Sequence, residues 1–329
     1  MNLDGKRIIV SRTDSIGDVM LTLPICHWIK EMAPSSHLIF LGKGYTKSVV
    51  EAYQKVDQFE DWGAYAESDA QTQLNWLKAL NADIIIHVFP SKNLASLAKK
   101  AGISMRVGTS HRLYHLLTCT HRVNFTRKKS DLHESQLNFE LLRPMGLSEI
   151  PELEEVSKAT EAFQPKKETL TEPFQSLKDY VILHPKSRGS AREWPMEKYV
   201  ALAKKLTESG KNVVFTGTEN EGKLFRDQLP SHDKIYDSTG QLSLEQLITL
   251  IGKSKGLIAC STGPLHIAGY SGIRAVGLFS PQRPIHPGRW KALGPDVRIL
   301  VCPGKSSEDA DYNCLQDITV ESAFDALTT

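Results

Sequence analysis

Residues between Gly256 and Gly272 carry the clearest chemical signal in this sequence. A short apolar run ending at Cys260 is typical of a buried strand, and Ser261-Thr262-Gly263 follows it directly. Pro264 comes next, and proline is favoured at the first position of a helix. A turn between a strand and a helix presents free backbone N–H groups and the positive end of the helix dipole, which suit a phosphate. The segment predicts a phosphate-binding turn; an ordinary Ser/Thr helix cap is the alternative.

A second segment begins with a predicted strand at residues 6–12 and continues into Ser-Ile-Gly-Asp-Val-Met-Leu-Thr-Leu-Pro at 15–24. Together with residues 261–268, it resembles the two terminal motifs of the heptosyltransferase family. These are inverting glycosyltransferases of the GT-B type that use ADP-heptose and lipopolysaccharide. Residues 184–195 and 237–247 match the family as well. The four matches occur in order and cover most of the chain.

Length and composition indicate an ordinary globular protein. The 329 residues suffice for two domains, and the net charge of +2 predicts no polyanionic partner. No apolar run of about 18 residues is present, so we expect no membrane-spanning helix. Residues 1–6 lack the basic start and apolar core of a signal peptide, so we expect the chain to stay in the cytoplasm.

The cysteines are few and widely spaced. Their number is odd and no CxxC occurs, so we expect reduced thiols and no thiol nucleophile. The five are Cys26, Cys119, Cys260, Cys302 and Cys314.

Apolar runs alternate with amphipathic helical patterns along the chain, which predicts parallel sheets covered by helices on both faces. We expect strands at 6–12, 37–42, 83–89, 104–108, 180–184, 212–217, 256–261 and 275–280. We expect helices at 18–31, 70–80, 92–101, 131–144, 196–209, 243–254 and 320–327.

Residues 148–178 interrupt this pattern and are rich in Glu, Lys, Thr and Pro, as in a linker. We therefore expect an α/β fold of the GT-B type, with two Rossmann-like domains facing each other across a cleft. The first, 1–165, would bind the acceptor, and the second, 166–329, the nucleotide sugar. The helix at 320–327 is expected to pack back on the first domain.

Glycosyl transfer to a hydroxyl needs a base that takes the acceptor proton. Asp18 is our candidate, because it lies where the first strand gives way to the first helix and the resemblance places the family's catalytic Asp there. A helix-cap role is the alternative, for which Asp14 is the better candidate. Gly17 would let the acceptor approach the backbone closely.

The leaving diphosphate is expected over Ser261, Thr262 and Gly263, with His266 one turn into the helix. Lys186, Ser187 and Arg192 follow the strand at 180–184 and would reach the same face. Arg192 stands where the resemblance places a donor-contacting Lys, and its guanidinium suits phosphate. Arg188 better fits a solvated loop.

The resemblance implies that a Glu shortly after the strand at 212–217 binds the nucleotide ribose. Glu219 and Glu221 both follow the strand that ends at Gly217, and we favour Glu221. Both also fit a first-turn Glu favoured by the helix dipole. Ser261 stands where heptosyltransferases that act on the inner core often carry Asp. The sequence therefore does not decide which donor sugar and which nucleotide base the chain uses.

No Asp or Glu occurs from Ile84 to Ser130, whereas nine Lys and Arg residues do. This local cationic excess indicates an anionic partner, which the resemblance makes a lipid-linked sugar acceptor. Lys92 and Arg112 follow strands and are our acceptor-binding candidates. The other cations are solvated helix faces or touch anionic lipid at the inner membrane. Aromatic residues are not interleaved with them, so we expect no nucleic acid.

We expect no metal and no cofactor beyond the donor substrate. Asp309-Ala310-Asp311 does not follow a strand, and His133-Glu134 lacks zinc-ligand spacing. The resemblance thus implies an inverting transferase that moves a heptose or related sugar, from ADP-heptose above all, to a lipopolysaccharide core hydroxyl. A same-fold nucleotide-sugar epimerase and a non-catalytic nucleotide-sugar or glycolipid binding protein are the alternatives.

Overall fold

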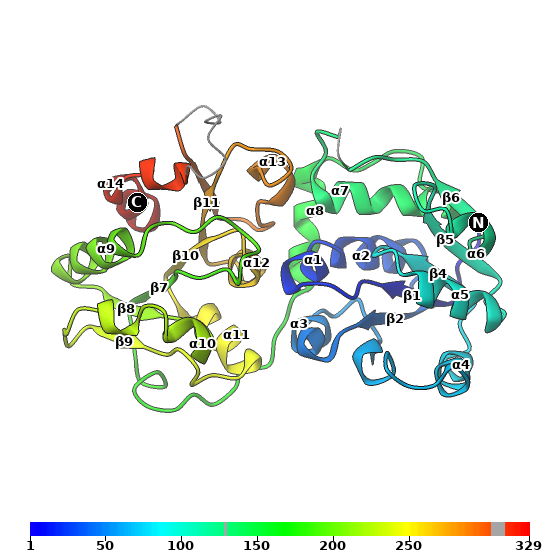
Figure 1. Cartoon of the computed structure of the whole chain (residues 1–329), viewed down its shortest axis with the longest axis horizontal. Coiled ribbons are helices and arrows are strands. Elements are labelled where there is room, and N and C mark those ends of the chain that lie inside the picture. The colour runs from blue at the N-terminus through cyan, green and yellow to red at the C-terminus, as the bar shows by residue number, and fades with distance from the viewer. Residues whose placement is uncertain (128–129, 304–312) are drawn as a thin grey trace. The chain divides into compact units, whose positions relative to one another are not determined.

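A computed structural model describes residues 1–127, 130–303 and 313–329, and Asp309-Ala310-Asp311 lies outside these residues. The chain divides into two compact units, Met1–Gln164 and Pro165–Thr329. Each unit is a sheet flanked by helices (Figure 1). In the part of the chain described, no helix combines the length and the apolar character that crossing a membrane requires.

The first unit contains a six-stranded parallel sheet with the order β3-β2-β1-β4-β5-β6. β1 and β4 lie at its centre, and their side chains are almost all buried, as expected for strands covered on both faces. The strands are β1 (Arg7–Ser11), β2 (His37–Gly42), β3 (Gln58–Asp61), β4 (Ile84–His87), β5 (Met105–Thr109) and β6 (His121–Val123).

The second unit repeats this arrangement, with the order β12-β11-β10-β7-β8-β9. Numbered within each unit, both sheets have the order 3-2-1-4-5-6 of the Rossmann fold. The strands are β7 (Tyr180–His184), β8 (Asn212–Phe215), β9 (Ile235–Asp237), β10 (Gly256–Cys260), β11 (Arg274–Phe279) and β12 (Val297–Val301). The prediction of an α/β fold with two Rossmann-like units is confirmed.

This strand order matters for function because ligands of such sheets bind where the chain connections change direction. That point lies between β1 and β4 in the first unit and between β7 and β10 in the second. The segments that follow these four strands are therefore the places to look for a site.

The helices largely follow the sequence periodicity. The predicted helix 18–31 is two helices, α1 and α2, and Pro24 lies in the first turn of α2, where its missing N–H costs nothing. The longer helices are α2 (Leu23–Met32), α4 (Ala70–Ala79), α5 (Lys92–Lys100), α9 (Met196–Glu208), α11 (Leu244–Lys253), α12 (Gly263–Tyr270) and α14 (Val320–Thr328). Shorter ones are α1 (Ile16–Met20), α3 (Lys47–Glu51), α6 (His115–Thr118), α7 (Glu134–Phe139), α8 (Leu153–Lys158), α10 (Glu219–Gly222) and α13 (Pro287–Trp290).

Four strands are absent from the sequence predictions: β3, β6, β9 and β12. All four lie at the edges of their sheets. β3 and β9 are half-buried throughout, and β12 is half-buried with one exposed end. An edge strand buries too little to need a continuous apolar run, so its sequence carries a weak signal.

The segment expected to be a linker is packed on both units. Tyr53 Oη donates to the carbonyl of Ala159 (3.0 Å), and the backbone N–H of Gln164 donates to the carbonyl of Ala52 (2.7 Å). In the second unit the backbone N–H of Glu168 donates to Thr249 Oγ1 (2.9 Å). Because the segment is rich in polar residues, its sequence gave no sign of these hydrogen bonds.

The C-terminal helix α14 packs on α9 and on β10, β11 and β12. Its Ala323, Ala326 and Leu327 belong to the core of the second unit. Its apolar face is therefore buried against the sheet of its own unit, and the expectation that it packs back on the first domain stays a prediction.

The expectation that every thiol is reduced is wrong for two cysteines. Cys302 and Cys314 form a disulfide, with their Cα atoms 5.9 Å apart. Cys26, Cys119 and Cys260 are free and buried, as a structural role requires. The sequence separation of 12 residues gave no sign that the chain returns to bring the pair together.

Two central strands end in buried histidines, His87 on β4 and His184 on β7. Burial lowers the pKa of His87 to about 3, and the charge of His115 adds to the shift. Burial also lowers the pKa of His184 to about 4, against the opposing effect of Glu221. Both imidazoles are therefore neutral in the folded chain well below the ordinary histidine pKa of about 6.5.

These histidines should make the free energy of unfolding fall in acid. Between pH 6.5 and about 4 the unfolded chain takes up protons that the folded chain does not, so folding is disfavoured as the pH falls. At pH 5 each histidine costs about 2 kcal/mol relative to pH 7.5. Urea unfolding at pH 5 and pH 7.5 measures how far the free energy of unfolding falls between them. That fall should be about 2 kcal/mol smaller in His87→Gln than in wild type. The exposed control His232→Gln should behave as wild type; equal pH dependence in all three chains would contradict the assignment.

Candidate active site

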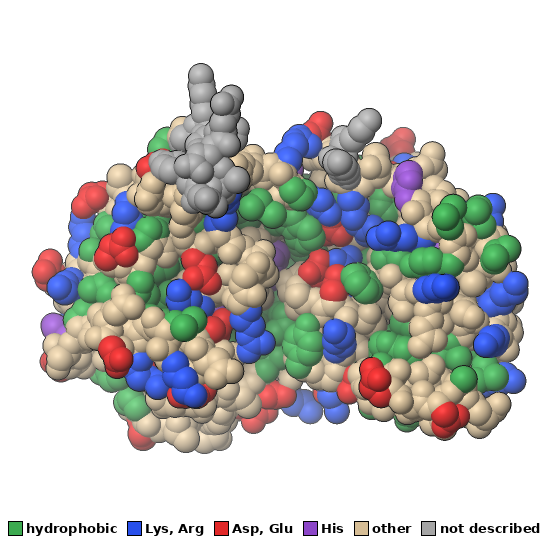
Figure 2. Space-filling model, in the orientation of Figure 1, with side chains coloured by type: hydrophobic (Ala, Val, Ile, Leu, Met, Phe, Trp, Pro, Cys, Tyr) green, Lys and Arg blue, Asp and Glu red, His purple; other side chains and the backbone are tan. Residues whose placement is uncertain are grey.

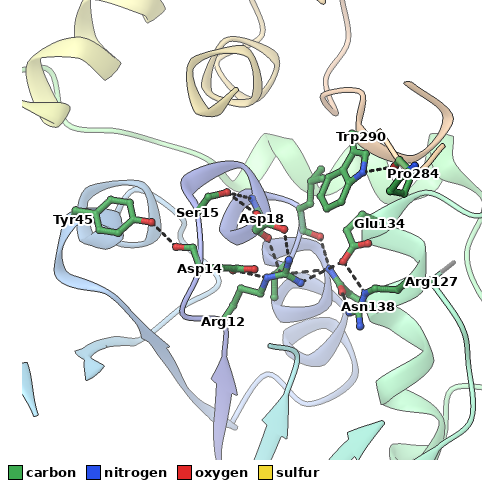
Figure 3. Close-up of polar contacts among 12 residues, drawn as sticks. Arg12, Asp14, Ser15, Asp18, Tyr45, Arg127, Glu134, Asn138, Pro284 and Trp290 are labelled. Carbon is green, nitrogen blue, oxygen red and sulfur yellow. Dashed lines mark hydrogen bonds and ion pairs between the residues drawn. The ribbon is translucent and has the colours of Figure 1, made fainter. Parts of the chain in front are cut away.

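The side chain of Arg12, directly after β1, organises the carboxyl edge of the first sheet (Figure 3). It is only 4% exposed. Its guanidinium pairs with Asp14 Oδ1 through Nε (2.7 Å), with Asp18 Oδ1 through Nη2, and with Glu134 Oε1 through Nη1 (3.4 Å). Three carboxylates thus meet on one buried cation at the point where the first sheet changes direction.

Helix α1 holds Asp18 in this position. Ser15 is the N-cap of α1, and its Oγ accepts from the backbone N–H of Asp18 (3.4 Å). The same hydroxyl donates to Asp18 Oδ2 (2.5 Å). The capping role proposed for Asp14 is therefore filled by Ser15, and Asp14 instead pairs with Arg12.

Glu134 anchors the network from the other side, at the first position of α7. It is 1% exposed, and its Oε1 also pairs with Arg127 Nε (2.9 Å). Arg127 Nη2 donates to Asn138 Oδ1 (3.3 Å), and Asn138 Nδ2 donates to the carbonyl of Leu21 (3.1 Å) at the end of α1. The network therefore returns to the helix that carries Asp18.

The network contains three carboxylates and two guanidiniums, which leaves one negative charge in excess when all are ionised. Burial raises the pKa of Asp14, and the neighbouring charge of Asp18 raises it further, against the opposing effect of Arg12. Burial works to lower the pKa of Arg12, but its three carboxylates outweigh burial and hold that pKa above the usual range. The side chains of Asp14 and Asp18 are 22% and 19% exposed, so solvent reaches them. A partly exposed carboxylate in such a cluster is suited to accept a proton.

The other acceptor candidates follow neighbouring strands. Gly17 is buried in α1, beside Asp18 in sequence. Lys92 opens α5 after β4, and Arg112 follows β5; both are exposed. The first unit therefore places Asp18, Lys92 and Arg112 after β1, β4 and β5, which are adjacent strands.

In the second unit, the predicted phosphate turn lies directly after β10. Thr262 is the N-cap of α12, but its side chain makes no capping hydrogen bond. Its buried Oγ1 has no hydrogen-bond partner among the residues described. The helix begins at Gly263, one residue earlier than expected, and Pro264 is its second residue. The backbone N–H groups that precede Pro264 lie at the start of the helix and are oriented to bind an anion.

His266 is buried in α12, with 2% of its surface exposed. It lies in the first turn beyond Gly263 and Pro264. The sequence placed it there, and its role toward a ligand stays a prediction.

The loop after β7 is held by Glu193. Its Oε2 pairs with Lys186 Nζ (2.9 Å), and its Oε1 accepts from the backbone N–H of Ser187 (2.8 Å) and from Ser187 Oγ (3.0 Å). Burial works to raise the pKa of Glu193, but Lys186 and Ser187 outweigh it and the net pKa is lowered. β7 and β10 are neighbours, so Lys186, Ser187 and Arg192 follow the strand beside the one that carries the phosphate turn.

The two ribose candidates have different surroundings. Glu221 forms a capping box with Thr218, whose backbone N–H (2.7 Å) and Oγ1 (2.8 Å) donate to Glu221 Oε2. Its Oε1 lies 3.9 Å from Nε of Arg188, which is 70% exposed. Glu219 pairs with Arg226 (2.9 Å) and is half-exposed. Both glutamates lie in the first turn of α10, as the sequence allowed, and Glu221 also caps the helix. Among the residues described, the ion pair of Glu221 Oε1 is the distant one with Arg188.

Sequence reasoning missed Glu134, Arg127, Asn138 and Glu193 as members of these clusters. Arg12 gave one signal, a charged residue that ends an apolar strand. Within residues 1–127, 130–303 and 313–329, no group of three or more His, Cys, Asp or Glu side chains is arranged to hold a metal ion.

Two Rossmann-like units, each with polar side chains collected after the central strands of its sheet, are the architecture of the GT-B fold. The solved structures support this fold. A glycosyl transferase family 9 protein from Veillonella parvula has a TM-score of 0.76 at 21% identity, covering 99% of this chain and 97% of that chain. E. coli ADP-heptose lps heptosyltransferase II also has a TM-score of 0.76, at 17% identity, with 98% and 97% covered.

The family is shown by sequence. The model of glycosyltransferase family 9 (heptosyltransferase) matches residues 74–318. A putative glycosyltransferase of Haemophilus influenzae is 27% identical over 328 residues, covering 92% of this chain and 91% of that protein. Lipopolysaccharide heptosyltransferase 2 of Salmonella typhimurium is 30% identical over 101 residues, which is 29% of each chain. The chain belongs to glycosyltransferase family 9, which confirms the resemblance drawn from the four motifs.

Glu134→Gln tests the network that holds Asp18. Removing the charge takes from Arg127 the carboxylate with which it pairs and from the buried Arg12 one of its three, so we expect the free energy of unfolding to fall by about 3 kcal/mol. Glu140→Gln is the matched control, because Glu140 pairs with the exposed Arg143 (2.6 Å). It should cost less than about 1 kcal/mol. Urea unfolding measures both, and equal costs would show that Glu134 carries no special electrostatic role.

Proposed function

We propose that this glycosyltransferase moves a heptose from ADP-heptose to a hydroxyl of a lipopolysaccharide core acceptor, with inversion at the sugar carbon. The family model names heptosyltransferases, and relatives that share a 101-residue segment are lipopolysaccharide heptosyltransferases. The observation that carries the proposal is Asp18, a partly exposed carboxylate held on a buried guanidinium at the switch point of the first sheet.

Asp18 acts as the general base in this proposal. One of its carboxylate oxygens takes the proton of the acceptor hydroxyl, and that hydroxyl oxygen forms a bond to the anomeric carbon. The bond between that carbon and the diphosphate oxygen breaks, and its electron pair leaves with the nucleoside diphosphate. Attack from the face opposite the leaving group inverts the configuration. Arg12 orients Asp18 through one carboxylate oxygen, and Ser15 fixes the second carboxylate oxygen.

The second unit holds the leaving group. The backbone N–H groups of Ser261, Thr262 and Gly263 and the dipole of α12 stabilise the negative charge that develops on the diphosphate. Lys186, Ser187, Arg192 and His266 add hydrogen bonds and positive charge from the neighbouring loop and helix. Glu221 Oε1 accepts hydrogen bonds from the ribose hydroxyls. This chemistry stabilises the leaving group without requiring a metal.

The acceptor is an anionic, lipid-linked sugar. Gly17 allows close approach beside Asp18, and the exposed cations Lys92 and Arg112 face the carboxylates or phosphates of the acceptor. The reaction takes place at a membrane surface, where a water-soluble nucleotide sugar meets its lipid-linked acceptor.

Asp18→Asn should lower kcat by a factor between about 10² and 10⁴, because it removes the proton acceptor and keeps the shape. Donor affinity, measured by calorimetry with ADP-heptose, should stay within about twofold, because no donor contact is assigned to Asp18. Asp83→Asn is the control: Asp83 pairs with Lys6 (3.2 Å) at the amino end of β4, and its loss should leave kcat unchanged. Full turnover in Asp18→Asn would remove Asp18 from the base role.

Arg192→Ala should weaken ADP binding by a factor between about 10 and 100, since a charge-assisted hydrogen bond contributes about 1.5–3 kcal/mol. The exposed Lys204 on α9 supplies the control Lys204→Ala, which should bind ADP as wild type does. Calorimetric titration with ADP, UDP and GDP measures both the loss and the base preference. Tighter binding of UDP or GDP than of ADP would contradict the proposed donor. It would not contradict the proposed transfer reaction.

A further inference from the structure

Three leucines on or beside the short helix α6 (His115–Thr118) face solvent. Leu113 is 83% exposed, Leu116 53% and Leu117 75%. Single exposed apolar residues are ordinary, but three large ones within five positions form a cluster, and such clusters mark interaction surfaces. We call Leu113, Leu116 and Leu117 the α6 leucines.

The opposite side of α6 is fixed, so the leucines cannot turn inward. His115 is fully buried, and its Nδ1 lies 2.8 Å from the carbonyl oxygen of Thr109 at the end of β5. The backbone packs so closely there that a Cβ added at Gly108 would lie 2.6 Å from His115 Nδ1. Exposure of the α6 leucines is therefore a property of how the helix is anchored.

Three cations surround the α6 leucines and bind the backbone of the same helix. Lys99 Nζ donates to the carbonyl of Leu117 (2.8 Å), and Arg122 Nη1 donates to that of Leu116 (3.3 Å). Arg106 Nε donates to the carbonyl of Thr118 (2.6 Å). Figure 2 shows hydrophobic and basic side chains side by side over the region of α5 and α6.

This charge is not neutralised nearby. The sequence from Ile84 to Ser130 contains no Asp or Glu. Neither Lys99, Arg106 nor Arg122 pairs with a carboxylate within the described part of the chain. We call Lys99, Arg106 and Arg122 the basic surround. The surface therefore combines exposed leucines with a basic surround that is free to attract anions.

We propose that the α6 leucines and their basic surround bind the chain to the surface of an anionic phospholipid membrane. Leucine side chains enter the boundary between headgroups and acyl chains, while Lys and Arg pair with headgroup phosphates. A second copy of this chain fits less well, because self-association through this surface would bring like charges together. The inference rests on the proposed function, which sets the transfer at a membrane surface, and deepens it by naming the part of the chain that binds the lipid.

Flotation with sugar-free lipid vesicles tests this surface directly. The full chain should float with vesicles of phosphatidylcholine and phosphatidylglycerol (7:3) and stay behind with pure phosphatidylcholine. The double variant Leu113→Ser with Leu117→Ser should bind the anionic vesicles at least tenfold more weakly. Leu224→Ser is the matched control, because Leu224 is 63% exposed in the second unit, and it should bind as wild type does.

The basic surround is tested separately. Lys99→Gln with Arg122→Gln should weaken binding about tenfold and flatten its salt dependence, whereas Lys204→Gln should change neither. Thermal melting shows that each variant is folded, and transfer to a water-soluble acceptor fragment should be unchanged in all of them. That readout separates a failure of this surface from a failure of the proposed function.

Unaltered vesicle binding in the leucine variant would overturn the proposal. Binding only to vesicles that carry the lipid-linked sugar would also overturn it and assign the surface to the acceptor. Self-association of the wild-type chain that the leucine variant abolishes, seen by light scattering in the absence of lipid, would assign the surface to a second copy.

Discussion

The structure of the candidate site depends on one buried cation. A guanidinium as enclosed as that of Arg12 is stable only when carboxylates surround it, and it draws Asp14, Asp18 and Glu134 to one point. Those residues come from the end of β1, from α1 and from α7, so the pairing fixes two helices against the sheet. Asp18 is consequently held in place before any substrate arrives, as its proposed role of proton acceptor requires.

The two units share one strand order but carry different polar groups after their central strands. In both, polar residues collect after the central strands, where parallel sheets bind ligands. The first unit carries an excess of carboxylate there, beside exposed cations, and suits a hydroxyl acceptor with anionic groups. The second carries a helix start and a Lys–Glu–Ser cluster, which suits a diphosphate.

The sequence predicted the elements that require a continuous pattern of apolar residues. The buried central strands appear within one or two residues of their observed ends in most cases, because strands covered on both faces must be apolar. The edge strands β3, β6, β9 and β12 escaped, because half-exposed strands have no such requirement. Asp18 and the turn at Ser261 were proposed from local motifs, and their roles stay predictions. Glu134 and Glu193 were not: Glu134 meets Arg12 across 122 positions of sequence, and a helix-opening glutamate gives no sign of its partner. The Cys302–Cys314 pair was also missed, because neither cysteine shows in the sequence which partner it has.

The most direct test of the central claim is the configuration of the new glycosidic bond. The chain would be supplied with ADP-heptose and a lipopolysaccharide acceptor that lacks core heptose, and the anomeric configuration of the product would be read by nuclear magnetic resonance. A single displacement with Asp18 as the base predicts a configuration opposite to that of the donor. A retained configuration would require two displacements, and it would contradict the account.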